Sequence, residues 1–519
     1  MVVMDRRKFL KYAGATGAVV GASALGLNYL SKPQSAPPSQ GTTTATATTT
    51  APSTAILPMI TRLTYEPSRI LNSKIYDIRV DLKISDPARR LSSVLVALEP
   101  VAYAHLPTDA FPQEETKTAA LQSPGLEKEI LSTVFSDLKG GREYDVRAGA
   151  ADSSGVVDER TLRTEYVREF ENIAALDDMT VIADYYPWYE KPSVEGNHWR
   201  DGDQEINGPS QHIDTPLLGE YASGDPIVIS KHIDWATGHG IDAFCMSWWT
   251  TGNDERTWDY HNTRNLEAFL KNPLAKDMQF CILYENNGRL KVTNPDDPAE
   301  KWIEDLDDPF NKGRLVSDFE YLTKYFSSPQ YLEIDGRPCV RFDYTVPFRG
   351  DIKGVLGAVR IKLRATGWDV YLINDLAGRS EYPSDLISAT ASGWRYPNIS
   401  SAHVLQVIEN TDALGGSTPP LILTPPKMNF DGAYKMWRDF SMKYGKDSIP
   451  VAWPGSIDTP RSPEYFENLL EPSIVNTTKA TIEVVALNGW ETRLQIEPAE
   501  EYGLTYLEVL KEVLAKTKT

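Results

Sequence analysis

Two hydrophobic patterns divide most of the chain. Between residues 61 and 170, apolar and polar residues alternate over short runs such as 76–84 and 91–98. Alternation with period two, interrupted by turn residues, is typical of antiparallel strands that bury one face. This region therefore predicts a small all-β sandwich.

The sandwich region contains one informative turn. Leu138 precedes the Gly140-Gly141 turn, and Tyr144 opens the next alternating run. This order resembles the tyrosine corner of fibronectin type III domains, in which the Tyr hydroxyl bonds back to upstream backbone. The resemblance implies an immunoglobulin/fibronectin III-like domain over residues 61–170. We expect it to act as a spacer, or as a brace against the next domain, and assign no catalysis to it.

From residue 178 to residue 519, short apolar runs alternate with helical patterns such as 227–239 and 265–270. Alternating strands and helices predict a parallel sheet, and the number of runs favours a TIM-type (β/α)8 barrel. A further run at 386–390 would shift the strand numbering by one. The expected strands are 180–183, 243–247, 280–284, 339–342, 370–373, 421–424, 449–452 and 483–487.

The first sixty residues fit neither pattern. Arg6 and Arg7, followed by Lys-Phe-Leu-Lys, precede a weakly apolar segment at 12–30. This arrangement is similar to a twin-arginine export signal. The segment is also long enough to remain as a membrane anchor. Residues 31–60 are rich in Thr, Pro and Ser and have little apolar surface to bury, so they predict a disordered stalk. We therefore expect an exported, extracellular or cell-surface protein.

Composition limits the classes of partner that the chain is expected to bind. The chain has 53 Lys and Arg against 72 Asp and Glu, a formal net charge of −19. Such a balance argues against nucleic acid, which requires a basic face. Cys245, Cys281 and Cys339 lie inside apolar runs without metal-ligand spacing, so we predict buried core thiols. We expect no cofactor and no metal, and nothing in the sequence sets an oligomeric state.

Candidate chemistry lies where the expected strands end, because barrel active sites collect there. Aromatic rings stack on the C–H faces of sugars, and paired carboxylates serve acid/base chemistry on glycosides. Core packing of the Trp residues and an ordinary polar rim are the alternative. The residues at these ends are Tyr185, Tyr186, Trp188, Tyr189, His198, Trp199, Trp248, Trp249, Glu285, Asp343, Tyr344, Asn374, Asp375, Asn488, Trp490 and Glu491.

Several motifs resemble glycoside hydrolase family 99, the endo-α-mannosidase type, and related family 99-like proteins. They include Tyr185-Tyr-Pro-Trp-Tyr189, His198-Trp199, Ser247-Trp-Trp249, Val451-Ala-Trp-Pro454-Gly455, and Asn488-Gly-Trp490 with Gln495-Ile-Glu497-Pro498. The resemblance implies a glycoside hydrolase that acts on an extracellular or envelope polysaccharide, with α-mannosides as one substrate type. It also implies that Glu497 is a supporting residue.

The final motif departs from the family. Its pattern is similar to Asn-Glu-Trp-x-Glu, but Gly489 and Thr492 stand here at the positions of the two catalytic Glu residues. We therefore predict Glu491 and Glu285 as the catalytic carboxylates. The predicted substrate-binding residues are Tyr185, Tyr186, Trp188, Tyr189, His198, Trp199, Trp248, Trp249, Asp343, Tyr344, Asn488, Trp490 and Glu497. A catalytically degenerate glycan-binding protein of the cell envelope is the alternative, and the two substitutions favour it.

Overall fold

The computed structural model describes most of the chain beyond residue 56. The described ranges are 57–121, 130–174, 178–194, 198–199, 214–249, 251, 259–297, 303–343, 345, 348–375, 401–415, 430–456 and 461–517. The predicted export segment, most of the predicted stalk, Tyr344 and the expected strands at 386–390 and 421–424 lie outside these ranges. Strand β1 begins at Met59, within the last residues that we assigned to the stalk.

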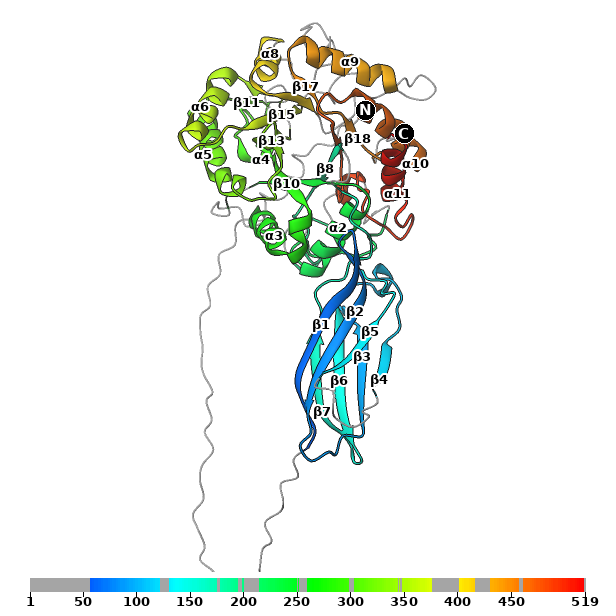
Figure 1. The fold of residues 1–519 in the computed structure, drawn as a ribbon. Coiled ribbons are helices and arrows are strands. Elements are labelled where there is room, and N and C mark those ends of the chain that lie inside the picture. Colours follow the sequence, from blue (N-terminus) through cyan, green and yellow to red (C-terminus); the bar gives the residue numbers. More distant parts are fainter. Residues whose placement is uncertain are drawn as a thin grey trace, which may run out of the picture.

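An all-β unit and an α/β unit follow one another along the chain (Figure 1). The β unit has two antiparallel sheets, with strand orders β1-β2-β5 and β4-β3-β6-β7, and encloses its own hydrophobic core. Its strands are β1 (Met59–Leu71), β2 (Lys74–Ser85), β3 (Ser93–Pro100), β4 (Lys117–Leu121), β5 (Leu131–Phe135), β6 (Tyr144–Asp152) and β7 (Gly155–Arg163).

The predicted tyrosine corner contact is present in the β unit. Tyr144 opens β6 with a buried side chain, and its hydroxyl accepts the N–H of Gly140 at 3.1 Å. The same hydroxyl donates to the Glu114 carboxylate. Gly140 and Gly141 have φ of 82° and 74°, a backbone conformation that glycine adopts without steric cost. The assignment to the fibronectin III class stays a prediction.

The α/β unit alternates strands with helices. Its main strands are β8 (Thr180–Tyr185), β9 (Ala243–Trp248), β10 (Gln279–Tyr284), β13 (Arg337–Phe342), β15 (Tyr371–Asp375), β16 (Ala413–Gly415), β17 (Asp447–Ser448), β18 (Val451–Ala452) and β19 (Thr481–Val484). The helices between and after them are α2 (Pro226–Gly238), α3 (Asp259–Lys271), α4 (Asn286–Arg289), α5 (Pro309–Phe326), α6 (Ile352–Ala365), α8 (Ser401–Asn410), α9 (Phe430–Lys443), α10 (Pro463–Asn476) and α11 (Thr505–Lys516).

These strands form one curled parallel sheet. Its order is β17-β16-β15-β13-β10-β9-β8-β19-β18, with β12 (Glu333–Ile334) paired antiparallel to β13. The two end strands, β17 and β18, are separated in sequence only by Ile449 and Pro450. The Ile449 N–H donates to Leu414 on one side, and Pro450 accepts the N–H of Glu483 on the other. The sheet therefore curls back on itself, an arrangement that fits a TIM-type barrel.

Most expected strands coincide with observed ones, whereas the sixth, at 421–424, lies outside the described residues. The strand that follows β15 is β16 at Ala413–Gly415, upstream of the predicted run at 421–424. Three residues are too short to show a hydrophobic period, so this strand carried no usable signal. The last strand also ends early, at Val484, because the N–H of Leu487 bonds to the Asp184 carbonyl outside the ladder.

Three helices begin with the same local chemistry. Asp225, Asp308 and Ser462 each precede a proline, and each side chain accepts the N–H of a residue in the first turn. These residues cap otherwise unpaired N–H groups, and proline fits the first helical position because it lacks an N–H to satisfy. Within the described ranges, no helix has the length and apolar character needed to cross a membrane.

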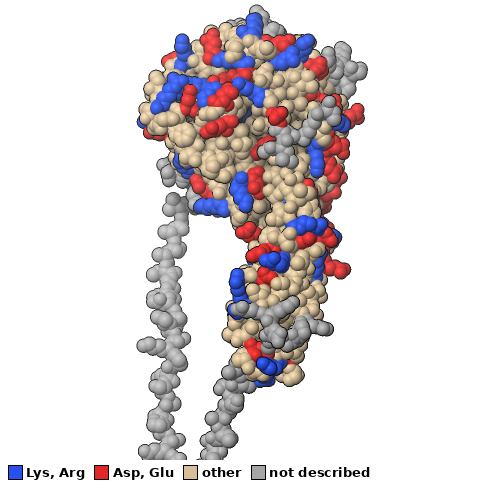
Figure 2. All heavy atoms as spheres, viewed as in Figure 1, with Lys and Arg blue, Asp and Glu red and all other residues tan. Residues whose placement is uncertain are grey.

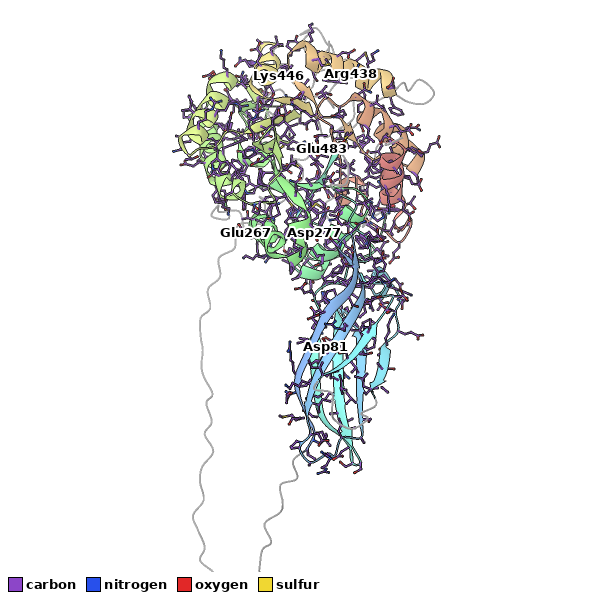
Figure 3. All side chains as sticks on the ribbon, in the orientation of Figure 1. Asp81, Glu267, Asp277, Arg438, Lys446 and Glu483 are labelled. Atoms are coloured by element: carbon purple, nitrogen blue, oxygen red, sulfur yellow. The ribbon has the colours of Figure 1, made fainter. Side chains whose placement is uncertain are left out.

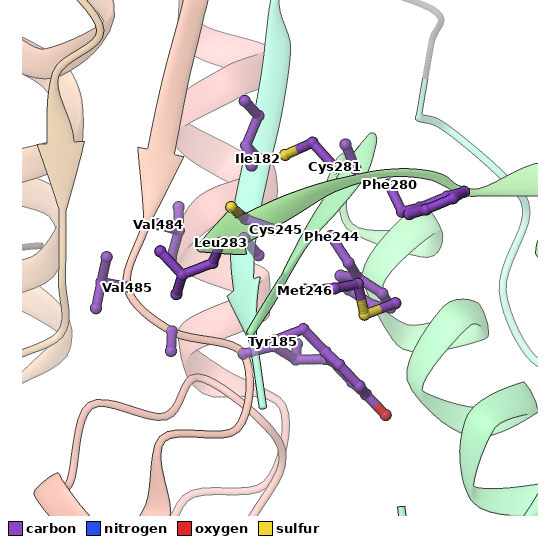
Figure 4. Close-up of a cluster of buried hydrophobic side chains, with 14 of the residues drawn as sticks. Ile182, Tyr185, Phe244, Cys245, Met246, Phe280, Cys281, Leu283, Val484 and Val485 are labelled. Carbon is purple, nitrogen blue, oxygen red and sulfur yellow. The ribbon is translucent and has the colours of Figure 1, made fainter. Parts of the chain in front are cut away.

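The three cysteines lie in the core of the α/β unit, as predicted, with free thiols. Figure 4 shows two of them, Cys245 and Cys281, among the buried side chains. The register pairs Cys245 with Cys281, and the next strand pairing carries the same row to Cys339. On the surface shown in Figure 2, acidic and basic side chains of the described residues are interspersed over both units.

Candidate functional site

Charged side chains cross the interior of the curled sheet. Arg341 on β13 reaches Asp184 on β8 and Glu483 on β19, although β13 is adjacent to neither strand. Glu483 is labelled near the centre of the sheet in Figure 3. Because side chains alternate along a strand, residues two positions further along β8 and β13 share this inner face. The strand register pairs Asp184 with Cys245, so Ser247, two positions further along β9, also faces inward. Ser247 pairs with Leu283 of β10, and Glu285, two positions beyond Leu283, is the next inward-facing residue.

Glu285 lies at the carboxyl end of the sheet beside an indole. Ser247 Oγ donates to Glu285 Oε1 at 2.7 Å, and Trp249 Nε1 donates to Ser247 Oγ at 2.9 Å. The Glu285 side chain is buried. Asn262 of α3 fixes this corner, since its amide donates to the Ser247 carbonyl at 2.7 Å. The predicted carboxylate and the predicted Trp249 are therefore brought together.

An aromatic cluster joins this corner to the loop after β8. Trp188 stacks on Tyr186 with ring centroids 4.6 Å apart, and on His198 at 5.1 Å. Trp249 lies 5.9 Å from Trp188 at a tilted angle. These four rings, which we call the aromatic shelf, come from two strand ends and the loop that carries His198.

Glu491 lies in a short 3-10 turn, η5 (Trp490–Thr492). The Tyr189 hydroxyl donates to the Glu491 carboxylate and lies 2.8 Å from the Asn488 carbonyl oxygen. Burial raises the pKa of Tyr189 well above its usual range, with the Glu491 charge adding to the effect, so the phenol keeps its proton. Glu491 is partly exposed, whereas the residues around it are buried.

Asn488 and Glu497 anchor the segment on either side of Glu491. The Asn488 side chain accepts the Tyr186 N–H at 2.7 Å and donates to the Tyr186 carbonyl at 3.0 Å. Glu497 is fully buried and accepts from Tyr221 at 2.7 Å and from Trp490 Nε1 at 2.8 Å. Glu497 therefore holds the Trp490 indole in place, and its supporting role in a glycosidase site stays a prediction.

Four predicted aromatic residues, Trp248, Tyr185, Trp199 and Tyr189, are at most 1% exposed and have almost no surface for stacking on a sugar. Trp248 is 0% exposed and packs outward between Tyr284 and Tyr321, with the Arg289 guanidinium over its ring. Tyr185 likewise packs outward, on Phe244. Trp199 is buried and donates to the Tyr221 carbonyl. We therefore correct their predicted role from substrate contact to packing.

Asp343 follows β13 and is buried, and its N–H donates to the Tyr284 carbonyl at 3.0 Å. Asn374 and Asp375 end β15, and the Asn374 amide donates to Thr411. Sequence reasoning missed Arg341 and Glu483, and it quoted Ser247 in a motif without giving it a role. The only available signal was a polar residue inside an otherwise apolar run.

Asp184, Cys245 and Glu483 offer ligand atoms within 4.8 Å of one another. A metal ion would have to share this place with a cation that the chain itself supplies. Arg341 Nη1 lies 2.6 and 2.8 Å from the two Asp184 oxygens and 2.7 Å from Glu483 Oε1. The donor set therefore fits the guanidinium that already occupies it.

No protein-family model matches the chain, and no curated protein matches it. Among solved structures, the chain is similar to the GH99 endo-alpha-mannosidase from Bacteroides thetaiotaomicron, with 19% identity, a TM-score of 0.48, and cover of 66% of this chain and 98% of that one. It is also similar to a b-glucuronidase from Ruminococcus gnavus, with 11% identity, a TM-score of 0.31, and cover of 88% and 68%. A third similar structure is the GH2 beta-galacturonidase from Eisenbergiella tayi, with 8% identity, a TM-score of 0.32, and cover of 88% and 72%.

Proposed function

We propose that this chain is a glycoside hydrolase-like protein that acts on an extracellular or envelope polysaccharide, with α-mannosides as the first substrates to test. The observation that carries the proposal is the combination at one end of the curled sheet. Glu285 lies next to the aromatic shelf through Ser247 and Trp249, and Tyr189 links the same loop to Glu491. The four rings of the shelf are 3–8% exposed, and aromatic rings beside two carboxylates suit a glycosidic bond.

The two carboxylates have different surroundings, as acid/base chemistry requires. Each carboxyl accepts a hydroxyl, Glu491 from Tyr189 and Glu285 from Ser247, but Glu491 is the more exposed of the two, and burial disfavours a charged carboxylate. We therefore assign Glu491 as the ionised carboxylate and buried Glu285 as the proton donor. In this assignment, Glu285 protonates the leaving oxygen as the glycosidic C–O bond breaks, and Glu491 supports the positive charge that develops on the sugar. Water then adds to the anomeric carbon, and its proton restores the acid form of Glu285.

The hydrolysis test uses the exported protein on a panel of α-mannans and related polysaccharides, with reducing ends as the readout. We expect wild type to release products, and Glu491→Gln and Glu285→Gln to lose at least about a hundredfold in rate. Glu500→Gln is the matched control, because Glu500 is exposed beyond the site and should retain wild-type rate. If wild type and Glu491→Gln are equally inert across the panel, the enzyme assignment fails.

A catalytically degenerate glycan-binding protein is the second candidate, and Gly489 favours it. A Cβ at this position would lie 3.2 Å from Leu494 Cβ and 3.4 Å from Ala486 Cβ. Neighbouring side chains thus crowd the place where the resembled family carries a catalytic Glu. This candidate predicts calorimetric binding without turnover. Binding would be lost in Trp188→Ala and kept in Trp248→Phe, since Trp248 has no exposed face.

We also propose the finer organisation that the sequence predicts. It comprises a (β/α)8 barrel behind a fibronectin III-like domain, and export through a twin-arginine signal with the option of N-terminal membrane tethering. The residues that support the export route are Arg6 and Arg7 before the apolar segment. Replacing both with lysine should abolish appearance of the protein outside the cytoplasm, as measured by fractionation. Undiminished export would overturn this route.

A further inference from the structure

Helix α2 contacts the β unit on one side and the candidate site on the other. Lys231 Nζ donates to Glu169 at 2.8 Å, and Asp234 accepts the Glu169 N–H at 2.6 Å. Glu169 belongs to the segment that leaves the β unit. His232 lies between Lys231 and Asp234 in α2, and its ring is turned toward Glu497. The helix therefore places a titratable side chain beside Glu497, and the sequence predicted no role in the site for this side chain.

Both ring nitrogens of His232 have partners. Nδ1 lies 3.0 Å from the Tyr185 hydroxyl, and Nε2 lies 3.0 Å from Glu497 Oε1. The ring is 0% exposed. Burial raises the pKa of Tyr185 beyond its usual range, so the phenol keeps its proton and donates it to Nδ1. The tautomer follows from these contacts, because Nε2 must then carry the hydrogen and donate to Glu497.

Glu497 passes this constraint to the turn that carries Glu491. Its Oε1 accepts from His232, which leaves Oε2 facing Tyr221 and the Trp490 indole. Charge-assisted hydrogen bonds of this kind are stronger and more directional than neutral ones. Without the His232 donor, the carboxylate can rotate about its last bond, and the indole then loses a fixed acceptor.

We propose that His232 is a positioning residue for the Trp490–Thr492 turn and acts through Glu497. Its role in ligand recognition rests on the proposed function, in which this turn contacts glycan. Its role in placing Trp490 does not, and it can be measured without a ligand.

The experiment labels the full chain with 5-fluorotryptophan and assigns the Trp490 fluorine resonance by its disappearance in Trp490→Phe. In His232→Ala, the Trp490 resonance should leave its wild-type position. In His232→Gln, it should return toward that position, because the Gln amide can donate to Glu497 in place of Nε2. His232→Leu fills similar space without a donor, so a resonance that returns in His232→Gln but not in His232→Leu assigns the effect to the hydrogen bond.

His239→Gln is the matched control, since His239 is also a buried histidine near the end of α2. Its ring contacts the Trp235 carbonyl at 2.6 Å and Phe170, away from the turn. The proposal is overturned if His232→Ala leaves the Trp490 resonance in place, if His239→Gln moves it equally, or if His232→Gln behaves as His232→Ala does. If His232→Ala does not fold, the Tyr185→Phe variant tests the positioning role instead. It removes only the donor to Nδ1 and should move the resonance in the same direction, and an unmoved resonance counts against the proposal.

Glycan calorimetry separates this proposal from the proposed function. If wild type binds a glycan of the panel, His232→Ala should bind it about tenfold more weakly, which is the loss of about 1.4 kcal/mol. If wild type binds none, the proposed function fails while the fluorine experiment still decides the positioning role.

Discussion

At the scale of single residues, Glu483 is the most unusual side chain in the structure. It is buried in the interior of the sheet, where one guanidinium, Arg341, faces two carboxyl groups. Burial raises the pKa of Glu483 well above its usual 4.5, and Asp184 adds to the rise. A protonated Glu483 leaves one positive and one negative charge in the interior, which is far less costly than a second unpaired carboxylate.

The protonated Glu483 predicts a pH dependence of stability. The native chain keeps a proton that the unfolded chain releases above the usual 4.5, so the free energy of unfolding falls as pH rises. The stabilisation from this retained proton is fully present below about pH 4.5. It then declines by about 1.4 kcal/mol for each pH unit until the pH passes the pKa of Glu483 in the native chain. Glu483→Gln is neutral in both states and should lose this slope, as measured by urea unfolding between about pH 5 and 7.

Glu508→Gln provides the comparison for this measurement. Glu508 is exposed on α11, so its carboxylate is solvated in both states and its loss should leave the slope unchanged. Parallel curves for wild type and Glu483→Gln would show that Glu483 is ionised in the native state.

Gly489 leads to a second residue-scale prediction. Its φ of −82° is open to any residue, so the cost of a side chain comes from crowding by Leu494 and Ala486 and not from backbone strain. Gly489→Ala should lower the free energy of unfolding by about 1–3 kcal/mol, typical of overpacking a filled site. Gly357→Ala in α6 is the control, because a Cβ there meets open space and the substitution should be neutral or stabilising. Gly445→Ala would not serve as a control, because the φ of Gly445 is positive. Equal stability of Gly489→Ala and wild type would show that the crowding relaxes freely.

At the scale of elements, α2 holds the two units together. Asp234 is fully buried and faces the buried Arg168 guanidinium at 3.6 Å, and it also accepts the Tyr166 hydroxyl at 3.1 Å. Arg168 further contacts Asp277, which Figure 3 labels near the junction. These contacts favour a brace over a free spacer for the β unit.

Asp234→Ala should therefore destabilise the joint strongly. The substitution leaves the buried Arg168 guanidinium with the Thr237 hydroxyl and the partly exposed Asp277 carboxylate as partners, for which a loss of about 3 kcal/mol is expected. The readouts are urea unfolding and proteolysis within 164–174. Asp145→Ala is the matched control, because it breaks the exposed pair with Arg163 and should cost less than about 1 kcal/mol. Similar losses in both variants would mean that the joint is no stronger than a surface ion pair.

Element-level patterns also explain what could be predicted and what could not. The alternating runs and the apolar runs after residue 178 correctly predicted most strands, because each run was long enough to show its period. The three residues of β16 form a strand that is too short to show a period. Side-chain parity separates Trp248, which packs outward on Tyr321, from Ser247, which faces inward. Grouping all strand-end aromatics together ignored that parity, which is why Tyr185 and Trp248 were misassigned.

At the scale of the whole molecule, sequence reasoning predicted residues at several strand ends but not the charged contacts that lie between the strands. The contact of Arg341 with Asp184 joins residues 157 positions apart, and that of Asn488 with Tyr186 joins residues 302 apart. A single sequence holds no signal for such pairs, because each partner is an ordinary polar residue in its own segment. The closure of the sheet around them creates the site.

Closure of the sheet also protects the three thiols, and this makes the last prediction. Cys245, Cys281 and Cys339 are each at most 1% exposed, and burial raises the pKa of Cys245 well above its usual range. Since the thiolate is the reactive form, the folded chain should react with none of its thiols in an aromatic disulfide reagent, and the unfolded chain in urea with all three. The sandwich contains no cysteine, so the number of reactive thiols reports opening of the α/β unit alone. The rate of thiol labelling in dilute urea should accordingly rise with unfolding of the curled sheet, followed in the same samples by the loss of near-ultraviolet circular dichroism. Rapid labelling of any thiol in the native protein would show that the interior of the sheet opens without unfolding.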